Sequence, residues 1–243
     1  MPKAVLSLQI LCLVLLLYPA TSCAKLRATV TMTTNNVQRW FTKSNNNVAA
    51  QANLDYQHSS GLYLGSSVSN IDFESDEHPD SSHVEIIPYL GWSFKLAEKW
   101  RIDAQWSRYL YDGEVFGHAA DYNEYYLFVH YNDLFTGRIS FSDDYYNVGH
   151  SVIDYQLTGK YPVLDNLEFS ASFGYSQTQA ALGSDYPYWN AGFTYYYKFL
   201  AVDLRYMDAT ETSVNYATEV QMHKLYNPPL LDSSVVFSIS LGF

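Results

Sequence analysis

The sequence predicts an all-β fold, a transmembrane antiparallel up-and-down β-barrel of about twelve strands that follows a cleaved signal peptide. Three observations predict it. Short segments alternate apolar and polar side chains, short connections alternate with longer ones, and 23 Tyr, 13 Phe and 5 Trp occur at a mean hydropathy of only −0.17. Barrels hide their hydrophobicity in alternation and place aromatic side chains at both membrane interfaces. A secreted soluble β-sandwich also alternates, but it needs its aromatic side chains inside.

Residues 1–24 have the layout of a secretory signal peptide. Lys3 supplies a basic start, residues 4–17 are mostly apolar, and the segment ends in small residues. The apolar part is too short for a membrane-spanning helix. We expect cleavage after Ala24. The alternative is a lipoprotein in which Cys23 becomes the lipidated first residue.

Residues 25–243 form the predicted barrel domain. Removal of the signal peptide leaves 219 residues with 13 basic and 25 acidic side chains, an excess that disfavours nucleic acid as a partner. Both cysteines, Cys12 and Cys23, lie in the removed segment. The mature chain is therefore expected to have no disulfide and no cysteine nucleophile. We expect no cofactor.

Alternation places twelve strands along the mature chain. They span residues 27–41, 48–57, 62–73, 83–94, 101–111, 122–131, 135–142, 151–161, 167–177, 188–199, 200–209 and 233–243. In each strand, side chains two residues apart share a face, so the apolar residues of a strand line up on one side. Representative apolar residues, in chain order, are Val30, Met32, Leu54, Tyr56, Ile86, Trp92, Ile102, Trp106, Leu127, Val129, Ile139, Phe141, Phe169, Phe173, Phe193, Tyr195, Leu204 and Tyr206.

The last strand shows the pattern most clearly. Val235, Phe237, Ile239, Leu241 and Phe243 alternate with mostly small polar residues. An aromatic C-terminus on such a strand resembles the sorting signal of bacterial outer-membrane barrels. We therefore expect the barrel assembly machinery to recognise the last four of these residues.

Connection length gives a second, independent test of the barrel. If the N-terminus lies in the periplasm, the periplasmic connections are 58–61, 95–99, 132–134, 162–166 and the turn near 199, and all are short. The external connections are then 42–47, 74–82, 112–121, 143–150, 180–187 and 210–232. Outer-membrane barrels have short periplasmic turns and longer external loops, whereas a soluble sandwich has no reason to show this asymmetry.

Seven charged residues occupy the polar faces of these strands, and we expect them to line the lumen. They are Asp103, Arg138, Asp154, Lys160, Glu168, Asp203 and Arg205. An ionised side chain facing the middle of a bilayer costs a few kcal/mol, so the lumen is the side on which these residues are tolerated. Two interpretations stay open: the residues pair into a network that fills the lumen, or some of them form a constriction that acts on a permeant solute.

One stretch carries a family resemblance. The motifs NNVQRWFTKSN at 35–45, VAAQANLDY at 48–56, SGLYLG at 60–65 and SNIDF at 69–73 resemble the TorF family of porin-like proteins. This family is also catalogued as Gcw_chp, a group of uncharacterised proteobacterial outer-membrane proteins. The resemblance is clearest over about residues 35–112. The chain departs at Trp40, where we expect a Gly after the Arg. The resemblance implies a barrel and a channel, but it supplies no substrate and no catalytic residues.

These observations lead to a functional expectation. We expect a passive porin-like channel for small polar solutes or ions in the outer membrane of a Gram-negative bacterium, with lipid and lipopolysaccharide as further partners. Solute would pass Arg138, Arg205, Asp103 and Asp203, with residues 210–232 as a lid. The acidic excess suggests a mild preference for cations.

Two other classes of function remain as alternatives. One is a structural or adhesive barrel without an open pore. The other is a barrel enzyme, for which His58 and Ser60 have the spacing of a phospholipase pair and His78 or His150, with acidic neighbours, could serve a protease. Turn chemistry explains the first pair better, and a solvated acidic loop is the commoner meaning of the second pattern. We therefore expect no enzyme. No spacing suggests a structural metal site.

Overall fold

The computed structural model describes residues 25–39, 41–73, 81–115, 117–210, 213–214 and 233–243. The expected signal peptide, residues 1–24, lies outside the described residues, as does most of the expected lid, 210–232. No helix among the described residues is both long and apolar enough to cross a bilayer.

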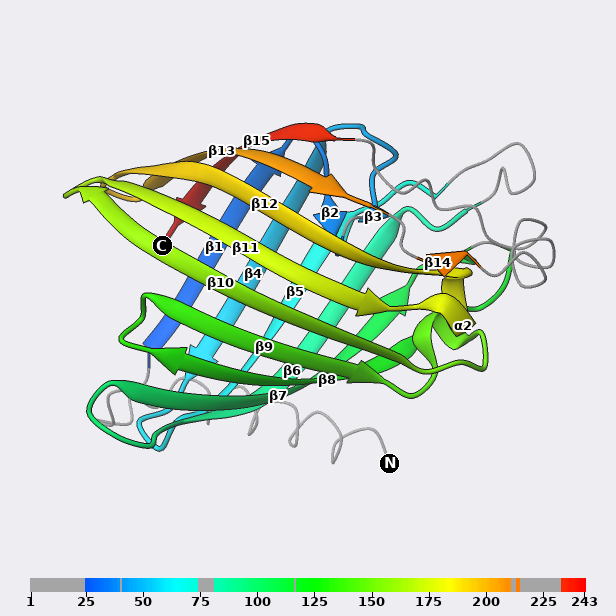
Figure 1. Cartoon of the computed structure of the whole chain (residues 1–243), viewed down its shortest axis with the longest axis horizontal. Coiled ribbons are helices and arrows are strands. Elements are labelled where there is room, and N and C mark those ends of the chain that lie inside the picture. The colour runs from blue at the N-terminus through cyan, green and yellow to red at the C-terminus, as the bar shows by residue number, and fades with distance from the viewer. Residues whose placement is uncertain (1–24, 40, 74–80, 116, 211–212, 215–232) are drawn as a thin grey trace, which may run out of the picture.

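The fold is a closed antiparallel β-barrel of twelve strands, which confirms the predicted fold class (Figure 1). Neighbouring strands in the wall are hydrogen-bonded along their length, and β11 pairs with β12 to complete the ring. The wall strands are β1 (Lys25–Thr33), β4 (Ala49–Gln57), β5 (Leu62–Asn70), β6 (Val84–Lys95), β7 (Trp100–Tyr111), β8 (Tyr122–Tyr131), β9 (Phe135–Ser142), β10 (Val152–Leu164), β11 (Leu167–Gln177), β12 (Ser184–Tyr197), β13 (Leu200–Ala209) and β15 (Ser234–Gly242).

The last strand joins the two ends of the chain. Strand β15 lies between β13 and β1, with Leu241 opposite Val30 in the register. The backbone of Phe243 also exchanges two hydrogen bonds with Ala28, at 2.8 and 3.1 Å. Because β15 satisfies the backbone of β1, the wall has no free edge at this point, as a barrel in a bilayer requires.

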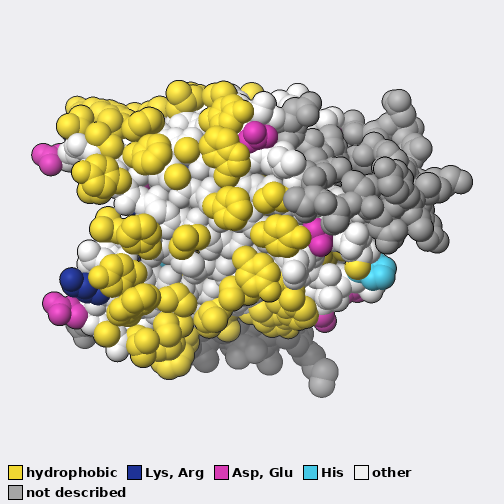
Figure 2. All heavy atoms as spheres, in the orientation of Figure 1, with side chains coloured by type: hydrophobic (Ala, Val, Ile, Leu, Met, Phe, Trp, Pro, Cys, Tyr) yellow, Lys and Arg dark blue, Asp and Glu magenta, His cyan; other side chains and the backbone are white. Residues whose placement is uncertain are grey.

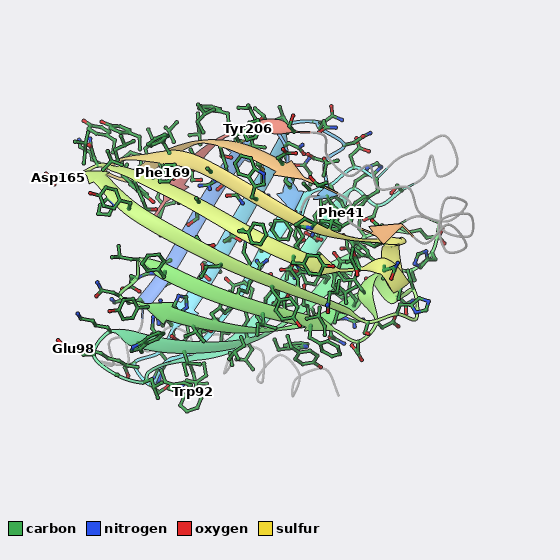
Figure 3. The ribbon with its side chains drawn as sticks, viewed as in Figure 1. Phe41, Trp92, Glu98, Asp165, Phe169 and Tyr206 are labelled. Carbon is green, nitrogen blue, oxygen red and sulfur yellow. The ribbon has the colours of Figure 1, made fainter. Side chains whose placement is uncertain are left out.

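Apolar side chains cover the outside of the wall. Leu54, Phe173 and Val235 are 52%, 60% and 60% exposed, and they belong to three different strands. Figure 2 shows apolar side chains spread over the face of the wall in view, with charged groups toward its ends, and Figure 3 shows Trp92 projecting outward. A soluble sandwich would have buried these side chains in a central core. The exposed apolar surface therefore supports the barrel interpretation.

The connections sort by length to the two ends of the barrel, as the sequence predicted. The short ones are 58–61, 96–99, 132–134, 165–166 and 198–199, and the long ones are 34–48, 71–83, 112–121, 143–151, 178–183 and 210–233. Asn132 and Asp133 both have positive φ, at 52° and 55°, as the tightest hairpin turns require. We call the two ends the short-turn end and the long-loop end.

One predicted element is wrong. Residues 27–41 were expected to form a single strand, but β1 ends at Thr33. Residues 34–39 and 41–48 instead leave the wall, and β2 (Val37–Gln38) pairs with β3 (Phe41–Thr42) inside the barrel. The run from Thr33 to Asn36 is polar at every position, so it has no apolar face to turn toward hydrocarbon. We call residues 34–48 the inward hairpin.

Three short elements complete the structure. The 3-10 helix η1 (Tyr145–Asn147) and helix α2 (Gln179–Leu182) lie in long connections, and β14 (Ser213–Val214) pairs with the start of β12. Two clusters of buried side chains lie at the long-loop end. One is centred on Tyr122 and Tyr145, the other on Phe41 and Tyr186.

Candidate functional site

The lumen differs between its two halves. On β8, Tyr122 and Glu124 near the long-loop end are 2% and 1% exposed, whereas Phe128 and His130 toward the short-turn end are only partly buried. The inner face of one strand therefore passes from a filled region to an accessible one.

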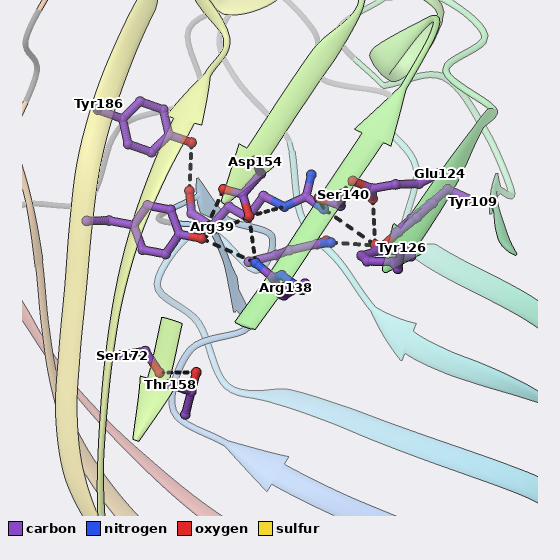
Figure 4. Close-up of polar contacts among 12 residues, drawn as sticks. Arg39, Tyr109, Glu124, Tyr126, Arg138, Ser140, Asp154, Thr158, Ser172 and Tyr186 are labelled. Carbon is purple, nitrogen blue, oxygen red and sulfur yellow. Dashed lines mark hydrogen bonds and ion pairs between the residues drawn. The ribbon is translucent and has the colours of Figure 1, made fainter. Parts of the chain in front are cut away.

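The tip of the inward hairpin reaches across the lumen to the far wall. The Arg39 guanidinium donates hydrogen bonds to the Glu124 carboxylate on β8 and, at 2.9 Å, to Ser140 Oγ on β9, and its Nε lies 3.6 Å from Asp154 Oδ1 on β10 (Figure 4). Tyr186 on β12 donates a 2.7 Å hydrogen bond to the Arg39 carbonyl. Residues far apart in the sequence are thus tied to a single arginine.

A second buried ion pair holds the other arm of the hairpin. Lys43 Nζ lies 2.5 Å from Glu85 Oε2 on β6, and both side chains are 3% exposed. Tyr111 donates a 2.9 Å hydrogen bond to the same carboxylate oxygen, and the Tyr109 ring lies 5.0 Å from Lys43 Nζ. Burial lowers the pKa of Lys43, and the Glu85 carboxylate opposes that shift.

Asp154 joins the hairpin to the wall. Its carboxylate is fully buried and lies 2.7 Å from Arg138 Nη2 on β9. Tyr188 on β12 donates hydrogen bonds to both of its oxygens, at 3.0 and 2.9 Å. We call the six charged residues that hold the hairpin the lock: Arg39, Lys43, Arg138, Glu85, Glu124 and Asp154. Three cations face three anions there, so the lock has no net charge.

Aromatic rings fill the rest of the long-loop half. Helix η1 points Tyr145 and Tyr146 into the barrel, and both rings lie 5.0 Å from that of Tyr122. Tyr122 in turn stacks on Tyr109 at 4.4 Å, nearly parallel. Together with the inward hairpin, these rings pack the long-loop half of the lumen.

The short-turn half contains a cavity, which we call the vestibule. It has a volume of about 380 Å³ and is open to solvent, and its lining comes from six adjacent strands, β1 and β4 to β8. The lining includes Lys25, Arg27, Asp55, Arg101, Asp103 and Phe128. A concave, mixed polar and aromatic surface of this size is within the usual range of small-molecule sites.

Two tyrosines lie along the wall of the vestibule because glycines face them across the sheet. Tyr63 is paired with Gly91 and Tyr89 with Gly65 in the β5–β6 register. A Cβ on either glycine would overlap the opposite tyrosine ring. The phenol of Tyr63 can therefore reach Asp103 Oδ1, to which it donates a 2.5 Å hydrogen bond.

The seven residues predicted to line the lumen all lie on the inner face of the wall, and each has a polar partner. Arg138 pairs with Asp154, Lys160 with Glu168 at 3.3 Å, and Arg205 with Asp203 at 3.0 Å. Asp103 pairs with Tyr63 and lies 3.9 Å from Arg101. This pairing corresponds to the network interpretation. A role of these residues in solute passage stays a prediction.

Four residues of the lock were missed at the level of sequence: Arg39, Lys43, Glu85 and Glu124. The two glutamates lie on the polar faces of predicted strands, so the alternation already pointed them inward. The two basic residues fall where the alternation predicts the end of a strand and a turn. Their signal was two cations in an asparagine-rich segment that directly follows the wholly polar run from Thr33 to Asn36.

The candidate enzyme residues form no catalytic arrangement among the described residues. His58 Nδ1 lies 2.8 Å from Ser60 Oγ, but both side chains also bond backbone amides of their own turn, those of Ser60 and Leu62. His150 is exposed, and His78 lies outside the described residues. No cluster in the part of the chain that the structure describes could hold a metal ion.

Comparison with known proteins places the chain in a family. Residues 18–243 match the family model described as "Bacterial protein of unknown function (Gcw_chp)". The chain belongs to this family. The description of the family assigns no activity to it. The TorF designation stays a prediction. No curated protein matches the chain.

Several solved structures with a similar fold are outer-membrane porins and channels. The KdgM porin aligns with a TM-score of 0.54 and 10% identity over 90% of this chain and 99% of its own. The COG4313 outer-membrane channel from Pseudomonas putida F1 aligns at 0.53 and 10% over 90% and 95%, and the NanC porin at 0.50 and 10% over 90% and 99%. At this identity the likeness establishes the fold, which is the porin-like barrel of outer-membrane proteins.

Proposed function

We propose that this Gcw_chp protein is a porin-like channel of the bacterial outer membrane that lets small polar solutes or ions diffuse passively. The observation that carries the proposal is an apolar outer surface around a lumen lined by ionised side chains and hollowed at one end. Hydrocarbon can contact the apolar outer surface and water can hydrate the charged lumen, so the barrel separates lipid from an aqueous interior. The porin and channel structures of similar fold support this function, as does the TorF resemblance of residues 35–45.

The outer surface supports the partners expected from the sequence. Lipid would contact the apolar belt, and lipopolysaccharide would meet the long-loop end. The apolar face of β15, with Phe237, Ile239 and Phe243 at 40%, 40% and 74% exposure, supports recognition of Phe237, Ile239, Leu241 and Phe243 by the barrel assembly machinery.

The inward hairpin makes this a channel that must open. In the conformation described here, the lock and the aromatic rings of η1 pack the long-loop half, so passage requires the hairpin to move. Movement breaks the Arg39 and Lys43 ion pairs, which are buried and therefore costly to separate. Openings of the unmodified protein should accordingly be infrequent and discrete.

Planar-bilayer recording of residues 25–243 tests the proposal. Arg39→Gln removes the charge at the hairpin tip, and we expect longer or more frequent openings than in the wild type. The matched control is Arg108→Gln, which removes an arginine whose only ion pair among the described residues is with Asp121 at 3.8 Å, away from the lock. This control should conduct like the wild type.

A second variant guards against misfolding of the first. Thr33 and Ala49 are direct partners in the β1–β4 register, so an Asn-Gly turn can replace residues 34–48 without changing the wall. We expect this variant to conduct continuously. If the wild type, Arg39→Gln and the hairpin deletion are all folded and all silent, the barrel is structural or adhesive and the channel proposal is wrong.

We also propose that the protein is not an enzyme. The His58–Ser60 pair lies in an exposed turn whose backbone amides it bonds, and the porins and channels of similar fold are not enzymes. Phospholipid or peptide hydrolysis that disappears on changing His150 or His78 would contradict this.

A further inference from the structure

The accessible half of the lumen is not acidic, although the whole chain has a net charge of −11. The lock pairs three anions with three cations and is neutral. The vestibule contains Lys25, Arg27 and Arg101 against Asp55 and Asp103, which leaves one positive charge. The expected mild preference for cations came from the total charge. The distribution of charge around the vestibule instead favours an anion.

The two carboxylates of the vestibule already have partners. Asp103 accepts the phenol hydrogen bond of Tyr63, and Asp55 accepts that of Tyr89. Arg101 is also occupied, because it lies 3.3 Å from Asp133 and 3.9 Å from Asp103. Each carboxylate of the vestibule therefore has a partner within the protein, and its remaining lone pairs can still accept a hydrogen bond from a ligand.

Two cations of the vestibule remain available. Lys25 and Arg27 lie two residues apart on the inner face of β1, and both are exposed. Neither forms an ion pair with any described residue of the chain. Two adjacent, unpaired cations at the edge of a cavity attract a carboxylate, and Arg27 can bind one in a bidentate manner.

The opposite side of the vestibule carries a row of stacked aromatic rings. Tyr126, Phe128 and His130 follow one another on the inner face of β8, with ring centroids 5.8 and 6.0 Å apart and planes within 9° and 11° of parallel. Phe128 and His130 line the cavity. The ring edges of such a row offer apolar contact to a ring-shaped solute. Gln57 and Asp55, also in the lining, can bond hydroxyl groups at the ring's edge.

We propose that the vestibule binds a small hydroxylated carboxylate, such as a hexuronate monosaccharide. Its carboxylate contacts Lys25 and Arg27, its ring lies against Phe128, and its hydroxyl groups bond Gln57 and Asp55. The inference rests on the proposed function in that the ligand is the solute that the channel passes. Binding itself needs no open pore, because the vestibule is accessible in the closed conformation.

The test is equilibrium binding to residues 25–243 in detergent micelles at low salt, measured by calorimetry or ligand-observed NMR. The probes are glucuronate, glucose, which has the same ring without the charge, and acetate, which has the charge without the ring. We expect glucuronate to bind at least about tenfold more tightly than either, a difference of about 1.4 kcal/mol. Equal binding of glucose would overturn the role of the cations, and equal binding of acetate would overturn that of the ring.

Variants connect the binding to these residues. The double change Lys25→Gln and Arg27→Gln should reduce glucuronate affinity to that of glucose, and Phe128→Leu should weaken both sugars together. Lys160→Gln is the control, because it removes a lumenal cation on β10 that pairs with Glu168 outside the vestibule lining. A loss in Lys160→Gln as large as in the double variant, or no loss in the double variant, would overturn the site.

The outcome is separable from that of the channel proposal. Binding without conductance in any variant would leave the site in place and remove the channel. Conductance without glucuronate binding would keep the channel and remove the site.

Discussion

The same strands have different surroundings at the two ends of the lumen. On β10, Asp154 near the long-loop end is fully buried between Arg39, Arg138 and Tyr188, whereas the Lys160 side chain near the short-turn end is 43% exposed. The wall does not cause this difference, because its alternation continues unchanged along the strand. The inward hairpin causes it, since it desolvates every charged residue that it touches. The inserted segment, together with the aromatic rings packed around Tyr122, thus divides a uniform barrel into a closed half and an open half.

The largest expected difference between the halves is in the cost of removing a charge. Asp154→Asn leaves the buried Arg39 and the partly buried Arg138 short of a counter-charge, and breaking a buried pair typically costs about 3–5 kcal/mol. Asp203→Asn should cost less, because the side chains of Asp203 and Arg205 are 23% and 20% exposed whereas that of Asp154 is fully buried. Urea unfolding in lipid vesicles, followed by tryptophan fluorescence, measures both. Equal losses would remove the distinction between the halves.

A smaller effect is expected where tyrosines lie over glycines in the vestibule wall. In Gly91→Ala the new methyl group would overlap the Tyr63 ring and displace its hydroxyl from Asp103. Overpacking of this kind costs about 1–3 kcal/mol. Gly137→Ala is the matched control, since a Cβ there meets nothing within 4 Å. The same unfolding experiment compares the two variants. If Gly137→Ala lost as much stability as Gly91→Ala, the loss would not come from overlap with the Tyr63 ring.

The smallest expected effect lies outside the lumen, in the connection 112–121. Burial raises the pKa of Asp112. Hydrogen bonds from Ser82 Oγ and from the amides of Val84 and His83 together lower it by more, so the net shift of the pKa is downward. A carboxyl with a lowered pKa in the folded state stabilises above its unfolded pKa, near 3.9, and loses that contribution as the pH falls through the folded value. Hydrogen exchange should show local opening of this connection near pH 3 and not at pH 7. In Asp112→Asn the opening should no longer depend on pH.

The sequence was sufficient to predict the wall of the barrel. Strand order, closure by β15 and the short and long ends follow from local alternation and turn residues, such as Asn132 and Asp133, and these signals are contained within about ten residues of chain. The inner position of Asp154 or Arg205 follows from the same alternation.

The lock could not be predicted in this way. Arg39 meets Glu124 and Asp154 from 85 and 115 residues away, and no periodic pattern links them. Arg39 also has a φ of 46°, a left-handed conformation that is uncommon outside glycine and that ends the extended backbone expected there. The polar run before it was the one local sign that this segment leaves the wall.

The most direct test of the account is the access of water-soluble reagents to the two halves. Both cysteines lie in residues 1–24, so residues 25–243 give a cysteine-free background. Ser140→Cys places a thiol beside Arg39 in the closed half, and Thr158→Cys places one in the open half, 2.8 Å from Ser172 in the present structure. Thr158→Cys should react with a charged thiol reagent on the order of 100-fold faster, because Ser140→Cys must wait for the lock to open. Equal rates would contradict the closure of the lumen by the inward hairpin.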